Sequence, residues 1–182
     1  MSLLPDRLPP QSIDSEAAAI GAALISRTAV ERVVELQRED FYVDAHRKIH
    51  DVMCHLFAQE QPVDTLTVPE ELKRRNQLEA VGGIAYVLTC AESVPTAAHV
   101  DWYCRIIRKK AVLRRLISAA GDITALAYAD ELEAEEIAAQ AERLIQTAGA
   151  TRGGAAQTLT EDAQTLHARL VAAHMGEADP PG

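Results

Sequence analysis

A long helical stretch in the middle of the chain constrains the fold more than any other feature. Apolar residues recur along it every seven positions, at Ile106, Leu113, Ala120 and Ala127. This period predicts one helix of about 28 residues, about 42 Å long at 1.5 Å per residue. Ahead of it, Pro95 disfavours a helical conformation of the preceding residue, so the chain must turn there. The sequence therefore divides into a part before Pro95 and a long helix after it.

A second apolar pattern follows the long helix, after a break at residues 128–131. Its members lie at helical spacing and are Leu132, Ile137, Ala141, Leu144 and Ile145. Two helices with a short connection form an antiparallel hairpin. Ile117 and Ile123 widen the apolar stripe of the first of these helices, and a hairpin alone leaves much of such a stripe uncovered. We therefore expect the hairpin to pack against a partner.

The part before Pro95 has the pattern of several short helices around one core. The clearest apolar stripe lies in residues 45–58. Gly82 and Gly83 suit a tight entry into the next helix, because glycine tolerates backbone angles that other residues avoid. Hydrophobic residues make up 48% of the chain but aromatic residues only 4%, a balance that favours packed helices over sheets. We predict an all-α fold: a compact multi-helix head, then a long antiparallel helical hairpin, then a separate linker helix.

The expected boundaries follow changes in composition. The N-terminal stretch is rich in proline and is expected to be mobile, whereas Gly153 and Gly154 indicate a flexible linker. The last helix starts with acidic residues and ends at Gly176. The predicted segments are a tail at 1–11, a head at 12–97, a hairpin at 98–150, a linker at 151–159 and a linker helix at 160–176.

Charge and cysteine content limit the classes of function. The net charge of −9 argues against a surface built mainly to bind phosphates. Cys54, Cys90 and Cys104 show no C-x-x-C spacing, which indicates buried thiols in a reducing compartment. The sequence has no signal peptide and no apolar run approaching the roughly 20 residues that span a bilayer. We expect a cytoplasmic location and no membrane partner.

One enzymatic alternative rests on His46, His50 and Asp51, because metal-dependent phosphohydrolases use histidines and His-Asp pairs as ligands. A spacing of four places the two histidines on the same side of a helix. No other histidine has a spacing that supplies the further ligands. We expect the two histidines to be ordinary helix-surface residues beside the apolar stripe, and Phe41 with Tyr42 to plug the core.

A basic cluster is conspicuous in this acidic chain. It lies in the first half of the long helix and consists of Arg105, Arg108, Lys109, Lys110, Arg114 and Arg115. One interpretation is a solvated face with salt bridges. Another is a contact with single-stranded nucleic acid, although aromatic stacking residues are sparse here. A third is pairing between subunits, because the acidic run at 130–136 lies at the hairpin tip and cannot reach the basic cluster of its own chain.

Several motifs, in order along the chain, resemble those of one known family. They are P-P-Q-S-I-D-S-E at 9–16, the D-F-Y…H…I pattern at 40–49, P-V-D-x-x-T at 62–67 and the long stretch from V-G-G-I-A-Y to R-R-L at 81–116. Together they resemble the N-terminal domain, with its linker helix, of bacterial replicative DNA helicases of the hexameric, primase-binding DnaB family. No G-x-x-x-x-G-K-[ST] phosphate loop occurs in the chain. We therefore expect no catalytic activity from this part.

The resemblance also implies a role in assembly. We interpret the chain as an excised part of an ATP-dependent helicase whose motor domain, with its ATP and Mg²⁺, is absent, so no cofactor is expected here. The resemblance implies a hexamer built as a trimer of dimers that pair through hairpins, a collar that binds the C-terminal domain of primase, and contact with single-stranded DNA only through the parent ring. A helicase loader is a further candidate partner. The alternative is a free-standing helical scaffold or regulator that copies the collar.

Candidate contact residues follow from the exposed patterns and from the resemblance. For primase they are Tyr86, Ile117, Ile123 and Ile137. For self-association they are Ile106, Leu113, Arg108, Arg115, Glu133 and Glu136. The linker helix is expected to contact a neighbouring subunit through Leu166, Leu170 and Val171. No catalytic and no metal-binding residue is expected.

Overall fold

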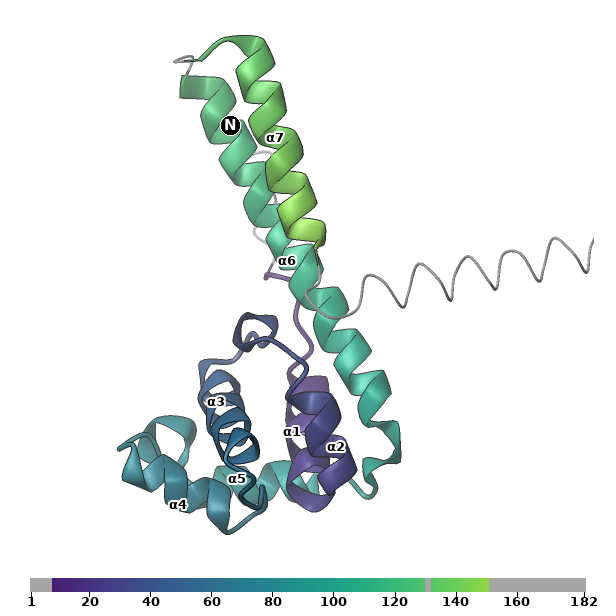
Figure 1. Ribbon diagram of the computed structural model, residues 1–182, viewed down its shortest axis with the longest axis vertical. Coiled ribbons are helices and arrows are strands. Elements are labelled where there is room, and N and C mark those ends of the chain that lie inside the picture. Colours follow the sequence, from purple (N-terminus) through teal and green to yellow (C-terminus); the bar gives the residue numbers. More distant parts are fainter. Residues whose placement is uncertain (1–7, 130–131, 151–182) are drawn as a thin grey trace, which may run out of the picture. The chain divides into compact units, whose positions relative to one another are not determined.

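A computed structural model describes residues 8–129 and 132–150. Within these ranges every regular element is a helix, which confirms the predicted all-α class (Figure 1). The predicted linker at 151–159 and linker helix at 160–176, with Leu166, Leu170 and Val171, lie outside the described residues. The α-helices are α1 (Ile13–Ile25), α2 (Arg27–Val33), α3 (Asp44–Ala58), α4 (Thr67–Arg74), α5 (Gly83–Glu92), α6 (Val100–Ala129) and α7 (Ala134–Gly149), with short 3-10 turns η1 (Arg38–Asp40), η2 (Glu79–Val81) and η3 (Ala97–His99).

The head is built around α1, which packs against several of the other helices. Gly21 of α1 lies directly against α5, since a Cβ atom at this position would be 2.0 Å from the Cys90 carbonyl oxygen. Only glycine permits this close approach of the two backbones. At the entry to α5, Gly82 and Gly83 have φ angles of 97° and 74°. These left-handed conformations confirm the predicted tight helix entry.

The hairpin consists of α6, which has 30 residues, and α7, which returns beside it (Figure 1). The first part of α6 belongs to the core of the head, where Val100, Cys104 and Ile107 are buried. The Arg115 Nε donates a hydrogen bond to the Ala148 carbonyl oxygen at 3.2 Å and so sets the register of the two helices. The predicted long helix and antiparallel hairpin are therefore present.

The two histidines of α3 are not surface residues, so that prediction is wrong. His46 and His50 have exposed fractions of 0% and 2%. Both imidazoles find polar partners inside the head, which offsets the cost of removing them from water. Phe41 is fully buried in the core, as expected, whereas Tyr42 is half-buried.

The end of the predicted tail is in contact with the hairpin. The Pro10 carbonyl oxygen accepts a hydrogen bond from Arg114 Nη1 at 2.9 Å. No helix in the described part of the chain is both long enough and apolar enough to cross a membrane.

Candidate interaction surfaces

A buried polar network joins three helices of the head. The Glu16 carboxylate of α1 is 1% exposed, and its Oε2 lies 2.8 Å from Nδ1 of His46 on α3. The other ring nitrogen of His46, Nε2, lies 2.8 Å from the hydroxyl of Tyr86 on α5. The His46 and Tyr86 rings are stacked at a centroid distance of 5.9 Å. The network therefore fixes α1, α3 and α5 relative to one another.

Glu16 also caps the start of α3. Val43 is the N-terminal cap residue of α3, and its own side chain makes no capping hydrogen bond. Instead the Glu16 carboxylate accepts the backbone N–H groups of Tyr42 and Val43 at 2.7 and 3.2 Å. A negative charge at a helix N-terminus satisfies free N–H groups and interacts favourably with the helix dipole. One carboxylate thus holds both the start of α3 and its first histidine.

Our sequence reasoning singled out Tyr86 but missed Glu16. The position of Glu16 in the sequence could have indicated its burial. Glu16 precedes Ala19 and Ile20 at spacings of three and four, so it lies on the apolar side of α1. His46 has the same relation to Ile49 and His50 on α3. A charged or polar residue on an apolar stripe indicates a buried polar partner on another element.

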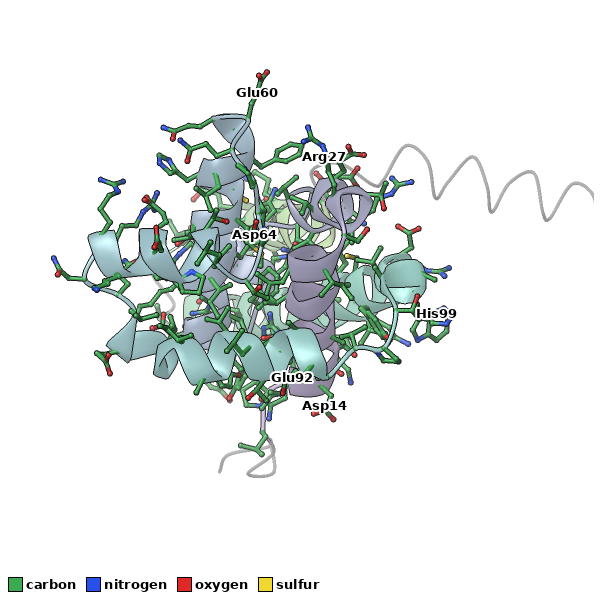
Figure 2. The ribbon with its side chains drawn as sticks, turned by 90° about the horizontal axis from the view of Figure 1, so that it is seen from below. Asp14, Arg27, Glu60, Asp64, Glu92 and His99 are labelled. Carbon is green, nitrogen blue, oxygen red and sulfur yellow. The ribbon has the colours of Figure 1, made fainter. Side chains whose placement is uncertain are left out.

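The candidate metal ligands are engaged in other contacts. His46 binds Glu16, the Nε2 of His50 lies 3.1 Å from the Val33 carbonyl oxygen, and Asp51 pairs with Arg38 at 2.8 Å. Among the described residues no group of three potential ligands could hold a metal ion. His99 is exposed and lies at the outer edge of the view in Figure 2. The phosphohydrolase alternative gains no support from this geometry.

Burial of His50 predicts a loss of stability in acid. Burial lowers the pKa of His50 below its usual value of 6.5, and the hydrogen bond to Val33 opposes this shift. The unfolded chain therefore binds more protons below about pH 6.5, so stability falls as the pH drops through this value towards the folded pKa. The slope contributed by one such group is at most about 1.4 kcal/mol per pH unit.

We expect His50→Gln to reduce this acid slope, because glutamine keeps an N–H donor but does not titrate. Urea unfolding of the two proteins at several pH values between about 5.5 and 7.5 measures it. His99→Gln is the matched control, since His99 is exposed and should leave the slope unchanged. Equal slopes for His50→Gln and the unmodified protein would contradict the prediction.

Three arginines of the basic cluster of α6 are paired with the head of the same chain. Arg108 lies 3.4 Å from Glu35. Arg114 donates to the Asp40 carbonyl oxygen at 2.7 Å, and Arg115 Nη1 lies 3.1 Å from the carboxylate of Asp40. These acidic partners, Glu35 and Asp40, belong to the head and not to the acidic run at 130–136. The contacts favour the salt-bridge interpretation for these three arginines.

Arg105 stands over the ring of Trp102 at 5.1 Å from its centroid, and both residues are exposed. Glu133 and Glu136 are exposed near the start of α7. A role of Arg108, Arg115 and these two glutamates in self-association remains a prediction. Both arginines already have acidic partners in the head.

The outer side of α6 carries an uninterrupted uncharged stripe, which we call the α6 stripe. Its members recur at helical spacings of three and four, and all are exposed: Leu113, Leu116, Ile117, Ala120, Thr124, Ala127 and Tyr128. Ile117 is 51% exposed and Tyr128 is 86% exposed. Apolar surface that continues over four helical turns is unusual on a face that stays in water and marks an interaction surface.

The predicted contact residues divide between this stripe and other places. Leu113 and Ile117 belong to the α6 stripe, whereas Ile106, Ile123 and Ile137 are half-buried. Ile123 follows the buried Ala119 by four residues, so it shares the covered side of α6.

Together, this fold and these surfaces define a helical assembly domain: a head stiffened by a buried network and a hairpin whose apolar side faces solvent. A family model described as the DnaB-like helicase N terminal domain matches residues 8–109. The chain belongs to this family.

Similar proteins support this assignment. The replicative DNA helicase DnaC of Bacillus subtilis is 43% identical over 144 residues, and DnaB of Geobacillus stearothermophilus is 42% identical over 144 residues. Both alignments cover 79% of this chain but only 32% of the relative, so the chain spans about a third of these proteins.

Solved structures show the same fold. The N-terminal domain of DnaB helicase from Mycobacterium tuberculosis superposes with a TM-score of 0.73 at 35% identity, over 77% of this chain and 99% of that domain. A DnaB-like replicative helicase, described with its interactions with primase, superposes with a TM-score of 0.64. That match covers 84% of this chain and 35% of the other at 20% identity, and so supports the fold alone.

Proposed function

We propose that this domain forms the non-catalytic collar of a replicative DNA helicase, where it pairs subunits and docks primase. In the complete protein the collar would sit beside an ATP-dependent motor and contribute to a hexameric ring around single-stranded DNA. The observation that carries the proposal is the α6 stripe, because it leaves a long apolar surface without a partner in the described part of the chain.

A second copy of the chain is the occupant that fits the α6 stripe best. The stripe has no charged member: three aliphatic residues at its start are followed by Ala120, Thr124, Ala127 and Tyr128. Two such stripes can pack against each other as helices do, with side chains of one helix between those of the other. Light scattering at micromolar concentration should therefore give at least a dimer, and a monomeric protein would contradict the pairing.

Primase docking is supported by the position of Tyr86. Its side chain is half-buried at the edge of α5, where the buried network holds the ring in one orientation. Aromatic residues that are already ordered make good anchors, because little conformational entropy is lost on binding. Ile117 is a second candidate, although it also belongs to the α6 stripe.

Titration of the C-terminal domain of the cognate primase tests this assignment. We expect saturable binding that Tyr86→Ala weakens at least about tenfold, which corresponds to about 1.4 kcal/mol. Ile123→Ala and Ile137→Ala should have smaller effects, because both side chains are half-buried in the hairpin. Circular dichroism must show unchanged helicity. The assignment of these docking residues would be wrong if all four variants, Tyr86→Ala, Ile117→Ala, Ile123→Ala and Ile137→Ala, bound the primase domain with the affinity of the unmodified protein.

A further inference from the structure

The head carries an open groove at the C-terminal end of α1. One wall comes from the end of α1 and the start of α2, and the other from the end of α3 and the segment that follows it. The groove has a volume of about 730 Å³, which is enough for several side chains. Its apolar lining includes Leu24, Ile25, Val30, Phe57 and Val63. Because Ile25 is 48% exposed and Phe57 is 36% exposed, the groove offers uncovered apolar surface to a partner.

The two walls of the groove carry opposite charges. Arg27 is the first residue of α2, whereas Glu60 and Asp64 follow the end of α3 (Figure 2). The Asp64 carboxylate already accepts the backbone N–H groups of Leu66 and Thr67 at 2.9 and 2.8 Å. The exposed Arg27 and Glu60 are therefore the charges that can meet a partner, one on each wall.

The N-terminal segment of the chain, residues 1–8, has the composition that fits this groove. Its sequence M-S-L-L-P-D-R-L contains three leucines, and one acid stands next to one base, at Asp6 and Arg7. Leu8, the described end of the segment, is 78% exposed, so its side chain has little cover in its own chain. The segment thus combines apolar side chains that lack cover with one charge of each sign.

The order of these charges matches the two walls. Pro5 disfavours a helical conformation of the residue before it. In an extended segment successive side chains point to opposite sides, so Asp6 can meet Arg27 while Arg7 meets Glu60. A partner with charges of one sign would instead face a like charge at one wall.

The groove lies beyond convenient reach of its own N-terminal segment. The Pro10 carbonyl is held by Arg114, three residues before α1 begins, whereas the groove lies at the other end of α1. From Ile13 to Ile25 the helix rises about 18 Å, and the six residues from Pro10 back to Leu4 span at most about 20 Å. Helices α2, α3, α5 and α6 all pack on α1 and obstruct the direct path. A second copy of the chain supplies the segment without this strain.

We propose that the groove binds residues 1–8 of a second copy of the chain, with Leu3 and Leu4 against its apolar lining and with Asp6 and Arg7 paired to Arg27 and Glu60. The contact joins two different parts of the chain, so each copy offers one groove and one segment, and the contact can pass from copy to copy. Pairing through the α6 stripe alone would stop at a dimer. The two contacts together would join dimers into a larger assembly, which adds a second interface to the proposed function.

A synthetic peptide of residues 1–9 tests the groove directly. Titrated into the full chain at micromolar concentration and followed by fluorescence anisotropy, it should bind saturably below about 1 mM. Leu4→Ser in the peptide should weaken binding about tenfold, because a leucine side chain is no longer buried. A change in the peptide cannot unfold the chain. Absence of binding, or equal affinity for the Leu4→Ser peptide, would overturn the inference.

A charge exchange tests the orientation of the segment. Asp6→Lys in the peptide and Arg27→Glu in the chain should each weaken binding about fivefold, since each places like charges together. The two changes combined should restore most of the affinity. Lys73→Glu is the matched control, because Lys73 is exposed on α4 outside the groove lining. Binding that is not restored in the combination, or an equal loss for Lys73→Glu, would overturn the proposed pairing.

Cross-linking of the full chain shows which copy supplies the segment. A chain with p-benzoylphenylalanine in place of Leu4 is irradiated together with a nitrogen-15-labelled chain that lacks the cross-linker. We expect mass spectrometry to find cross-links to residues 24–30 or 57–63 of the labelled chain. Cross-links confined to one chain would assign the groove to its own segment and overturn the inference, as would cross-links to other parts of the labelled chain.

The inference can be separated from pairing through the α6 stripe. Ile117→Asp lies outside the groove lining, so this variant should bind the peptide with unchanged affinity. Peptide binding by a chain whose α6 stripes do not pair would support the groove and contradict only the stripe. A loss of peptide binding in Ile117→Asp with unchanged helicity would overturn the groove assignment.

Discussion

Ile117→Asp is expected to separate the chains of the proposed dimer. Ile117 lies in the middle of the α6 stripe and is exposed in the single chain, so aspartate should not disturb the folded monomer. At an apolar interface between two stripes, the same carboxylate would be buried without a partner. An uncompensated buried charge costs about 3–5 kcal/mol, which corresponds to at least a hundredfold weaker association. Leu113→Asp should act in the same direction.

Ser118→Asp is the matched control for this experiment. Ser118 is the next residue on the same helix and is also exposed, but it lies on the side of α6 away from the stripe. Sedimentation equilibrium over a range of concentrations measures both variants against the unmodified protein. We expect dissociation for Ile117→Asp and none for Ser118→Asp. A dimer that survives Ile117→Asp would place the self-association surface elsewhere.

Glu16→Ala is expected to be the most destabilising single change in the head. It removes the acceptor of two backbone N–H groups at the start of α3 and of the buried His46 imidazole. These donors would remain buried without a partner. Breaking a buried charged network of this kind costs about 3–5 kcal/mol, a large share of the roughly 5–15 kcal/mol that stabilises a typical domain.

Urea unfolding at a fixed protein concentration measures this change, because association of the folded chain also contributes to its stability. Asp14→Ala is the control: Asp14 is an acidic residue in the same first turn of α1, but it is exposed. We expect its effect to stay below about 1 kcal/mol. A similarly small effect of Glu16→Ala would mean that water replaces the carboxylate and that the network is not a structural centre of the head.

The helices and their order could be predicted because their signals are local. The apolar repeat at Ile106, Leu113 and Ala120 marks a long helix, since residues at such spacings share one side whatever surrounds them. The turn at Pro95 and the entry at Gly82 depend on backbone sterics of one or two residues. The hairpin could also be predicted from the sequence, because two helices joined by a short connection pack side by side.

The tertiary structure decided which polar side chains meet and which apolar side stays exposed. His46 is separated by 30 residues from Glu16 and by 40 from Tyr86, and no local pattern selects these partners. The same holds for Arg115, which finds Asp40 at a distance of 75 residues in sequence. A period describes the sides of a helix but not the neighbours that cover them. Thus the sequence by itself determined an all-α head and hairpin. Packing between distant elements buried two histidines, paired three arginines of the basic cluster and left the α6 stripe exposed, because burial depends on contacts that only the folded chain brings together.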